Sequence, residues 1–349
     1  MSNNQLNSNN VISSSINNTS HELSDDQLTL TSLTNPNISL NGSNSDLFRF
    51  VDQLNTKEMK SETLLLSEKT IIDKIVDLIF EERCKDIEPK VINQQINNYI
   101  NIQSITLQNI VNWLLNNQND SNSIFLLGYF YLTGIGIRVD YEKAFKLFIN
   151  ASKQDHILAL FYLGECCENG YGIIKDTKLA LDYYKKAANK NYIAGQIKTA
   201  YYYYFGYGTK KDFKKTVDWF EMAENNGSFV AMCQLGYCYK DGIGVDVDYN
   251  KAFELFKKSA KEGHPEGVLM VGYCYEYGIG TNNDNKKAIE FYKKAANLGN
   301  RIAQYNLGNI YENGYDTDKD IDKAIDWYKK SAEQGFQNAQ LKLDLLNEN

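Results

Sequence analysis

Glycine recurs at a constant spacing of 36 residues through much of this 349-residue chain. Six glycines keep that spacing without a slip: Gly134, Gly170, Gly206, Gly242, Gly278 and Gly314. A fuller pattern repeats around each of them and is most regular between Ala231 and Gly263. A fixed period of this size is typical of a solenoid, in which similar supersecondary units stack and share a continuous core. An array of this kind grows by adding units, so the period constrains the fold more than the length does.

Each unit is predicted to be a pair of helices joined by a glycine turn. Ala231, Leu235 and Tyr239 are spaced i, i+4 and i+8, so they form one apolar stripe on a first helix. Gly236 lies beside this stripe, where the missing side chain lets two helices approach closely. The Gly-x-Gly that follows ends the first helix, because glycine adopts the left-handed conformation that other residues resist.

An aspartate stands just before the second helix of every unit. These six residues share one repeat position: Asp140, Asp176, Asp212, Asp248, Asp284 and Asp320. A carboxylate at that place can accept the unpaired N–H groups of the first helical turn. We therefore expect all six to be helix N-caps.

The repeated pattern resembles the Sel1-like repeat, a relative of the tetratricopeptide repeat. It reads Ala-x-x-x-Leu-Gly-x-x-Tyr-x-x-Gly-x-Gly, then Asp, Lys-Ala, an aromatic residue and Ala-Ala. The resemblance covers residues 121–349, as six repeats of 36 residues plus a partial seventh helix. It implies an all-α fold, a right-handed α-solenoid of Sel1-like helix pairs with a helical N-terminal cap. The departures from the pattern are Cys167, Thr199-Ala200, Thr216, Asp316 and Asp344, which makes the third repeat the least regular.

The residues before the array fall into two regions. Residues 1–44 are rich in Asn and Ser and are expected to be a disordered tail, because they can bury too little apolar surface to order themselves. Residues 45–120 are expected to be helical, with an amphipathic helix around Ile71–Phe80 and another opened by Pro89. One interpretation is a cap that shields the first repeat. The other is a docking or dimerisation segment built on the Ile71–Phe80 helix.

Composition restricts the classes of partner. The net charge is −7, so the basic footprint of a nucleic-acid-binding protein is missing from the sequence. The sequence predicts no membrane span and no secretory signal, which leads us to expect a cytoplasmic protein. Some secreted Sel1-like proteins join the two helices of a repeat by a disulfide, but the second helices here carry no cysteine. The six cysteines are therefore expected to be small buried thiols.

Candidate catalytic and metal-binding residues are few. His156 and His264 share a repeat position three units apart, which separates them by roughly 30 Å if stacked layers are about 10 Å apart. Residues 316–322 resemble the start of a calcium loop, but Ile321 replaces its glycine and Trp327 its final glutamate. We expect no enzyme activity, no catalytic residues, no metal, no cofactor and no small-molecule ligand.

Aromatic residues on the predicted first helices are the candidate binding residues. Tyr129, Tyr201, Tyr237 and Tyr273 share one repeat position. The next turn of helix adds Tyr204, Lys240, Glu276 and Tyr277. The resemblance implies that first helices line a concave groove, in which these residues would form an aromatic column that binds protein partners. The alternative is that the tyrosines only complete the packing between repeats.

The function that we expect is a non-enzymatic scaffold or adaptor. It would bind partner proteins on the concave face and assemble signalling or quality-control complexes, as the resemblance implies. An alternative is a regulatory or activator subunit that docks a kinase or synthase through its N-terminal helices. A hydrolase is less favoured, because no nucleophile and base are apparent in the sequence.

Overall fold

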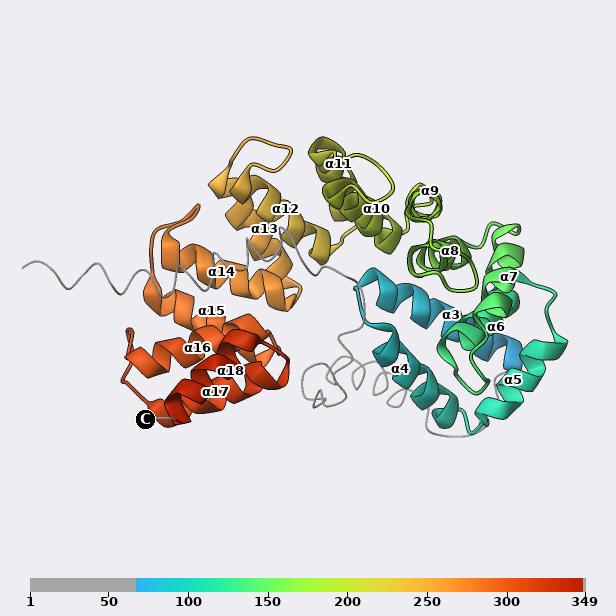
Figure 1. Cartoon of the computed structure of the whole chain (residues 1–349), viewed down its shortest axis with the longest axis horizontal. Helices are drawn as coiled ribbons and strands as arrows, with labels where there is room; N and C mark the ends of the chain where they lie inside the picture. Colours follow the sequence, from blue (N-terminus) through green and yellow to red (C-terminus); the bar gives the residue numbers. More distant parts are fainter. Residues whose placement is uncertain (1–66, 348–349) are drawn as a thin grey trace, which may run out of the picture. The chain divides into compact units, whose positions relative to one another are not determined.

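The computed structural model describes residues 67–347, which form sixteen α-helices and no strand (Figure 1). This confirms the predicted all-α fold of consecutive helix pairs. The tail predicted over residues 1–44 lies outside the described residues, as do residues 45–66. No helix of residues 67–347 is long and apolar enough to cross a membrane.

Six helix pairs follow three helices that lie outside the repeat. The three are α3 (Glu68–Cys84), α4 (Pro89–Ile102) and α5 (Leu107–Asn116). The first helices of the pairs are α6 (Ser121–Thr133), α8 (Ile157–Asn169), α10 (Ile193–Phe205), α12 (Phe229–Asp241), α14 (Pro265–Tyr277) and α16 (Arg301–Asn313). The second helices are α7 (Tyr141–Ser152), α9 (Thr177–Ala188), α11 (Phe213–Asn225), α13 (Tyr249–Lys261), α15 (Asn285–Asn297) and α17 (Ile321–Glu333). A last helix, α18 (Gln337–Asn347), follows them.

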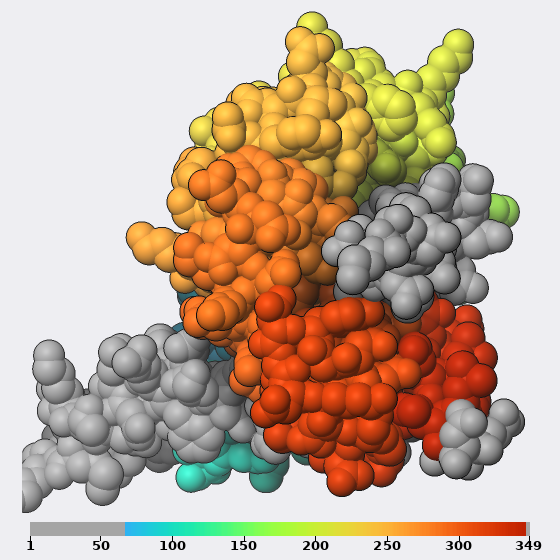
Figure 2. Space-filling model, turned by 90° about the vertical axis from the view of Figure 1, so that its left-hand side faces the viewer, coloured from blue at the N-terminus to red at the C-terminus, as the bar shows by residue number. Residues whose placement is uncertain are grey.

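The described residues divide into two compact units. The N-terminal unit contains residues 67–267 and 278–282, and the C-terminal unit contains residues 268–277 and 283–347. In the C-terminal unit, α17 packs against both α16 and α18, and these helices form one dense body in Figure 2. In the N-terminal unit, each first helix packs against the second helix of its own pair.

The two helices of a pair approach closely at the glycine predicted to allow it. The Cβ of any other residue at Gly236 would overlap the ring of Phe256 on α13. The same holds at Gly164, which faces Tyr184. In both pairs an aromatic ring of the second helix lies directly over the glycine of the first.

The turns between paired helices confirm the predicted left-handed glycines. The glycine that ends each of the six first helices has a φ between 67° and 81°. The second glycine of the turn serves a different purpose, since it contacts the preceding repeat. A Cβ at Gly244 would overlap the carbonyl group of Phe213, the first residue of α11.

The six repeated aspartates are N-caps, as predicted. Each carboxylate accepts the backbone N–H of the residue three positions later, over 2.9–3.0 Å. A lysine three residues after the aspartate ion-pairs with the same carboxylate in four repeats: Lys143, Lys215, Lys287 and Lys323. In the fourth repeat, Lys251 Nζ donates to the hydroxyl of Tyr239 instead, and in the second repeat Leu179 takes the place of the lysine. The start of every second helix is therefore fixed by a side chain from the turn.

First helices use a different set of caps at one shared repeat position. His156 and His264 accept a backbone N–H through Nδ1, as Ser228 and Asn300 do through their side-chain oxygens. The Nε2 of His156 also contacts Asn122 Oδ1 at 3.0 Å, so only a neutral imidazole with its proton on Nε2 satisfies both contacts. Burial lowers the pKa of both histidines to about 4. The two histidines are structural caps.

The cysteines are free thiols, as expected. Five are buried and Cys84 is half-buried. Burial raises the pKa of Cys84 to about 11. A thiol held in its protonated form is a weak nucleophile.

The helix α5 stands where a second helix of an earlier repeat would stand. A Cβ at Gly136 would meet Leu107, the first residue of α5. In the next repeat, the equivalent Gly172 meets Tyr141, the first residue of α7. The turn of the first repeat therefore lies on the start of α5 as later turns lie on the preceding second helix, although Gly136 meets a side chain and Gly172 a backbone carbonyl group.

The histidine caps predict a loss of stability in acid. The pKa of a histidine is about 6.5 in the unfolded chain, and that of these two is about 4 in the folded protein. Their contribution to the free energy of unfolding is therefore complete above pH 6.5 and is lost as the pH falls toward 4. The variant His156→Asn copies the cap at Asn300. When the pH falls from 7.5 to 5, we expect the free energy of unfolding of this variant to decrease by roughly 1–2 kcal/mol less than that of the native chain. Urea unfolding at the two pH values measures the difference. Equal losses in the two proteins would contradict this assignment.

The sixth turn predicts a stabilising substitution. Asp316 occupies the second glycine position with a φ of 47°, which is unfavourable for a residue with a Cβ. We expect Asp316→Gly to raise the free energy of unfolding by about 0.5–1 kcal/mol. Asp318→Gly is the control, because Asp318 has no positive φ. Glycine relieves no backbone strain there and only raises the entropy of the unfolded chain, so we expect this variant to be less stable than the native chain. If both variants were destabilised equally, strain at Asp316 would be refuted.

Candidate protein-binding surface

The candidate surface is the side of the first helices that carries the predicted tyrosine column. In the N-terminal unit this side, here called the first-helix face, is formed by α6, α8, α10 and α12. It carries Tyr129, Glu165, Tyr201 and Tyr237 at one repeat position. The remaining candidate residues are in the C-terminal unit and are described separately below.

The helix α3 already covers part of the first-helix face (Figure 1). Its N-terminal end contacts the start of α6, where Lys69 Nζ lies 2.8 Å from Asp120 Oδ1. Its C-terminal end reaches α8 and α10. There Arg83 donates to the carboxylate of Glu165, and the ring of Phe80 lies 4.8 Å from that of Tyr192. This helix therefore crosses the first three repeats.

Apolar burial and one buried ion pair hold α3 in place. Its isoleucines are almost completely buried: Ile71, Ile72, Ile75 and Ile79. The side chain of Arg83 is 7% exposed, and its guanidinium lies 5.1 Å from the ring centre of Phe161. Burial alone would lower the pKa of Arg83, but Glu165 and nearby tyrosines raise it above its ordinary value. Removing either partner would leave a buried charge without compensation.

Tyr129 lies beneath the N-terminal helices. Its side chain is fully buried, and its hydroxyl donates to Asn93 Oδ1 of α4 over 2.7 Å. Its ring packs edge to face on Tyr162 at 5.4 Å. A partner could contact Tyr129 only after α4 had moved.

Tyr201 and Tyr204 are half-buried on α10. The ring of Tyr201 packs edge to face on Phe220 at 5.5 Å, and burial raises its pKa. The ring of Tyr204 lies 5.6 Å from Phe213 and 4.8 Å from Phe205. Each ring therefore has one side in the protein and part of its surface in solvent.

Tyr237 and Lys240 form a small polar group on α12. The hydroxyl of Tyr237 donates to Glu266 Oε1 over 2.5 Å, and its ring packs on Phe256 at 5.4 Å. Lys240 Nζ lies 5.9 Å from the ring centre of Tyr237 and 2.6 Å from Asp241 Oδ1. Tyr237 is half-buried, so its ring both packs and contributes to the surface.

The other three candidates lie together at the end of α14. The rings of Tyr273 and Tyr277 are 4.6 Å apart, and Tyr277 is 39% exposed. Glu276 accepts a hydrogen bond from Tyr292 on α15, and burial raises the pKa of its carboxyl group. Glu276 is therefore an acceptor within the repeat, while the exposed candidate is Tyr277.

Sequence reasoning missed a pairing between first and second helices. In three repeats a second-helix tyrosine donates to a glutamate 16 residues earlier: Tyr184 to Glu168, Tyr292 to Glu276 and Tyr328 to Glu312. The other repeats have phenylalanine in place of the tyrosine, and the earlier residue is not acidic: Phe148 with Leu132, Phe220 with Tyr204 and Phe256 with Lys240. Tyrosine and glutamate occur together in the sequence, so the 16-residue spacing was an available signal.

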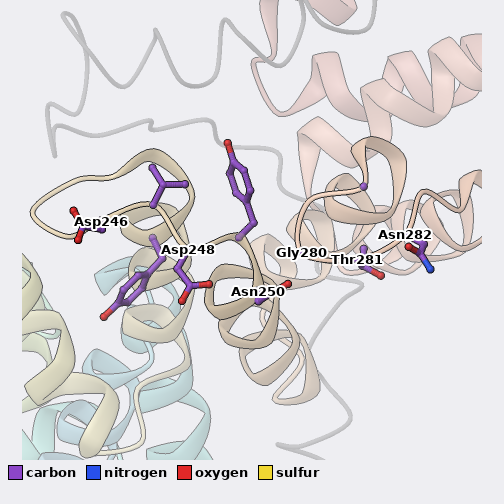
Figure 3. A pocket seen from close by; sticks show the side chains of 10 residues that line it. Asp246, Asp248, Asn250, Gly280, Thr281 and Asn282 are labelled. Atoms are coloured by element: carbon purple, nitrogen blue, oxygen red, sulfur yellow. The ribbon is translucent and has the colours of Figure 1, made fainter.

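A surface hollow of the N-terminal unit lies at the turns of the fourth and fifth repeats (Figure 3). It has a volume of about 1020 Å³ and is lined by Tyr239, residues 246–250, Gly278 and residues 280–282. Asp248 lines it while capping α13. Within residues 67–347, no group of three or more His, Cys, Asp or Glu side chains is arranged to hold a metal ion.

Comparison with known proteins identifies the repeat. The family model described as Sel1 repeat matches residues 121–156, 157–192, 193–228, 230–264, 265–300 and 301–336. A comparison with curated protein sequences gives no match.

The solved structures that share the fold include two with TM-scores above 0.6. A Sel1 repeat protein from Oxalobacter formigenes has a TM-score of 0.62 and 28% identity, over 68% of this chain and 96% of that one. The protein c5321, a protective antigen present in uropathogenic Escherichia coli strains that displays an SLR fold, has a TM-score of 0.61 and 27% identity. That match covers 79% of this chain and 59% of the other.

The tyrosine–glutamate pairing predicts that two substitutions together are tolerated better than one. Tyr292→Phe removes the hydroxyl that donates to Glu276, so we expect a loss of about 1–2 kcal/mol of stability. Adding Glu276→Leu copies the Phe148–Leu132 pair of the first repeat and should restore part of that loss. Urea unfolding of the two single variants and the double variant measures the coupling. Additive losses would show that the two residues do not act as a pair.

Proposed function

The chain belongs to the Sel1 repeat family, and we propose that it is a non-enzymatic adaptor that binds partner proteins on its first helices. Proteins with this repeat are generally protein-interaction scaffolds. The proposal extends to the cytoplasm as its location and to the assembly of signalling or quality-control complexes as its role. The chain presents partly exposed aromatic rings on the first-helix face, at Tyr201, Tyr204 and Tyr237.

The observation that carries this proposal is the position of α3. This helix lies on the first-helix face of the first three repeats and is held there by isoleucines and by the Arg83–Glu165 pair. The face can therefore bind a helix of the same chain, which supports its ability to bind a segment of another protein. Beyond α3, the rings of Tyr201 and Tyr237 offer a rigid, partly apolar surface of the kind found at binding hot spots.

The alternative, a regulatory subunit that docks through its N-terminal helices, has less support. The apolar side of α3 faces the repeats, so it is not available to another protein while α3 stays in place. The side of α3 that faces solvent is polar and includes Lys74, Asp77 and Glu81. We propose instead that α3, α4 and α5 cap the array over residues 67–116.

Histidine chemistry gives the hydrolase alternative little support. His156 and His264 each use Nδ1 to cap a first helix, and both are half-buried, with the pKa lowered so that the neutral form persists at pH 7. A general base needs a lone pair directed at the substrate. In these two residues that lone pair is used by the backbone.

The proposal predicts that binding and stability can be separated at Tyr237. We expect Tyr237→Ala to weaken a partner captured on the full chain by about 10-fold, which is roughly 1–2 kcal/mol, when affinity is expressed per folded molecule. Tyr183→Ala is the matched control, because Tyr183 is a half-buried tyrosine on a second helix. Calorimetry with the purified partner gives the affinity, and thermal unfolding gives the folded fraction.

Two results would contradict the proposal. A stability loss of several kcal/mol with unchanged affinity would assign Tyr237 to packing alone. A triple variant, Lys74→Ala with Asp77→Ala and Glu81→Ala, tests the alternative. Loss of the partner on that variant alone would favour docking through α3.

A further inference from the structure

The third repeat carries a group of aromatic side chains that is found in none of the other repeats. Tyr204, Phe205, Tyr207 and Phe213, here called the aromatic cluster, lie at the end of α10, in the turn and at the start of α11. The ring of Phe205 lies 4.8 Å from Tyr204 and 5.3 Å from Tyr207, and Tyr204 lies 5.6 Å from Phe213. The four rings therefore form one connected surface.

Much of this aromatic surface is in contact with solvent. Tyr207 is 40% exposed and Phe213 is 43% exposed, and the other two rings are half-buried. Exposed aromatic area of this kind is unfavourable in water unless something covers it. A contiguous group of such rings is typical of a binding surface, whereas single exposed rings are common.

The turn does not need these rings for its shape. Gly206 has a φ of 78°, within the range of the equivalent glycines. Other repeats form the same turn with Asn169 or Asp241 at the position of Phe205, and with Thr177 at the position of Phe213. The aromatic residues of the third repeat are therefore not explained by the requirements of the turn.

Lysines border the cluster. Residues 207–215 contain four lysines and one aspartate, which gives +4 − 1 = +3 in a chain whose net charge is −7. Lys215 pairs with Asp212 at 3.0 Å. Lys210, Lys211 and Lys214 are exposed, and none of them has an ion pair within residues 67–347. The aliphatic chain of Lys211 lies over Gly206, beside the aromatic cluster.

We infer that the aromatic cluster and these three lysines dock an acidic segment of a partner protein. Carboxylates of the segment would pair with Lys210, Lys211 and Lys214, while an apolar or aromatic side chain would cover the rings. The inference rests on the proposed function, since it assumes that the chain binds proteins, and it adds a site with a defined ligand chemistry that shares only Tyr204 with the first-helix face.

Charge favours a short acidic segment over a nucleic acid or an anionic membrane. Three lysines can neutralise a few carboxylates, whereas a polyanion extends beyond them. The rest of the chain is acidic and would repel that extension. Asp241 on α12 lies close enough to Tyr204 to raise the pKa of its hydroxyl, together with the dominant effect of burial.

The second repeat offers a matched control for the charge. Lys175 and Lys178 stand 36 residues before Lys211 and Lys214, are exposed, and have no ion pair within the described residues. Lys175 also lies next to the turn glycine of its repeat, Gly170. Substitution there changes the net charge equally, at a turn that lacks three of the four rings and keeps only Tyr171 at the position of Tyr207.

The test selects random twelve-residue peptides displayed on phage against the full chain. We expect the selected peptides to be rich in Asp and Glu. Binding of a synthetic selected peptide should weaken at least about 10-fold on Lys211→Glu with Lys214→Glu, and by less than about twofold on Lys175→Glu with Lys178→Glu. Phe213→Ala should weaken it as well, while thermal unfolding shows that all variants stay folded.

Other outcomes would overturn the inference in distinguishable ways. Selected peptides without excess acid, equal losses on the two lysine pairs, or no selected peptide would each refute it. Stronger binding of a dT12 oligonucleotide or of phosphatidylserine vesicles through Lys211 and Lys214 would assign the patch to those ligands. Peptides lost on Tyr237→Ala but kept on the lysine variants would refute this inference and leave the proposed function standing.

Discussion

The structure depends on the close contact between the turn of one repeat and the second helix of the repeat before it. At Gly172 and Gly244, the backbone of the turn lies directly on the carbonyl group that begins the preceding second helix. Only a residue without a Cβ fits there, and both glycines also have a positive φ. One position thus combines chain reversal with stacking. This explains why the period stays at 36 residues, because an insertion in the turn would move the contact point.

The features that repeat could be predicted from the sequence. A residue type that recurs every 36 positions indicates that each repeat needs the same backbone conformation or hydrogen bond at that place. The left-handed glycines and the aspartate caps are both of this kind. The close approach at Gly236 could be predicted for the same reason. Periodicity in the sequence reveals such features because each repeat solves the same packing problem with the same residues.

Contacts between the array and the residues before it could not be predicted in this way. The Arg83–Glu165 pair and the Tyr129–Asn93 hydrogen bond each join a repeat to a helix outside the repeat, so no period relates the partners. The tyrosine column could be predicted from the repeat position that its members share, but that position does not reveal that α4 covers Tyr129. The Tyr292–Glu276 pair was overlooked for another reason. Its signal is that tyrosine at one repeat position occurs together with glutamate 16 residues earlier. A search for residues common to all repeats does not detect such a dependence between two positions.

The placement of α3 also has a consequence for the order in which the chain is synthesised. This helix ends at Cys84, whereas α10, the last of the first helices that it crosses, begins only at Ile193. A ribosome that adds about 5–20 residues per second needs several seconds or more to cover that distance. During this interval α3 can pack on α4, α5 and α6 as they emerge, but its C-terminal end, with Phe80 and Arg83, has no partner until α8 and the start of α10 have been made. Transiently exposed apolar surface makes a nascent chain prone to aggregation, so the C-terminal end of α3 is the part of this helix that stays at risk for longest.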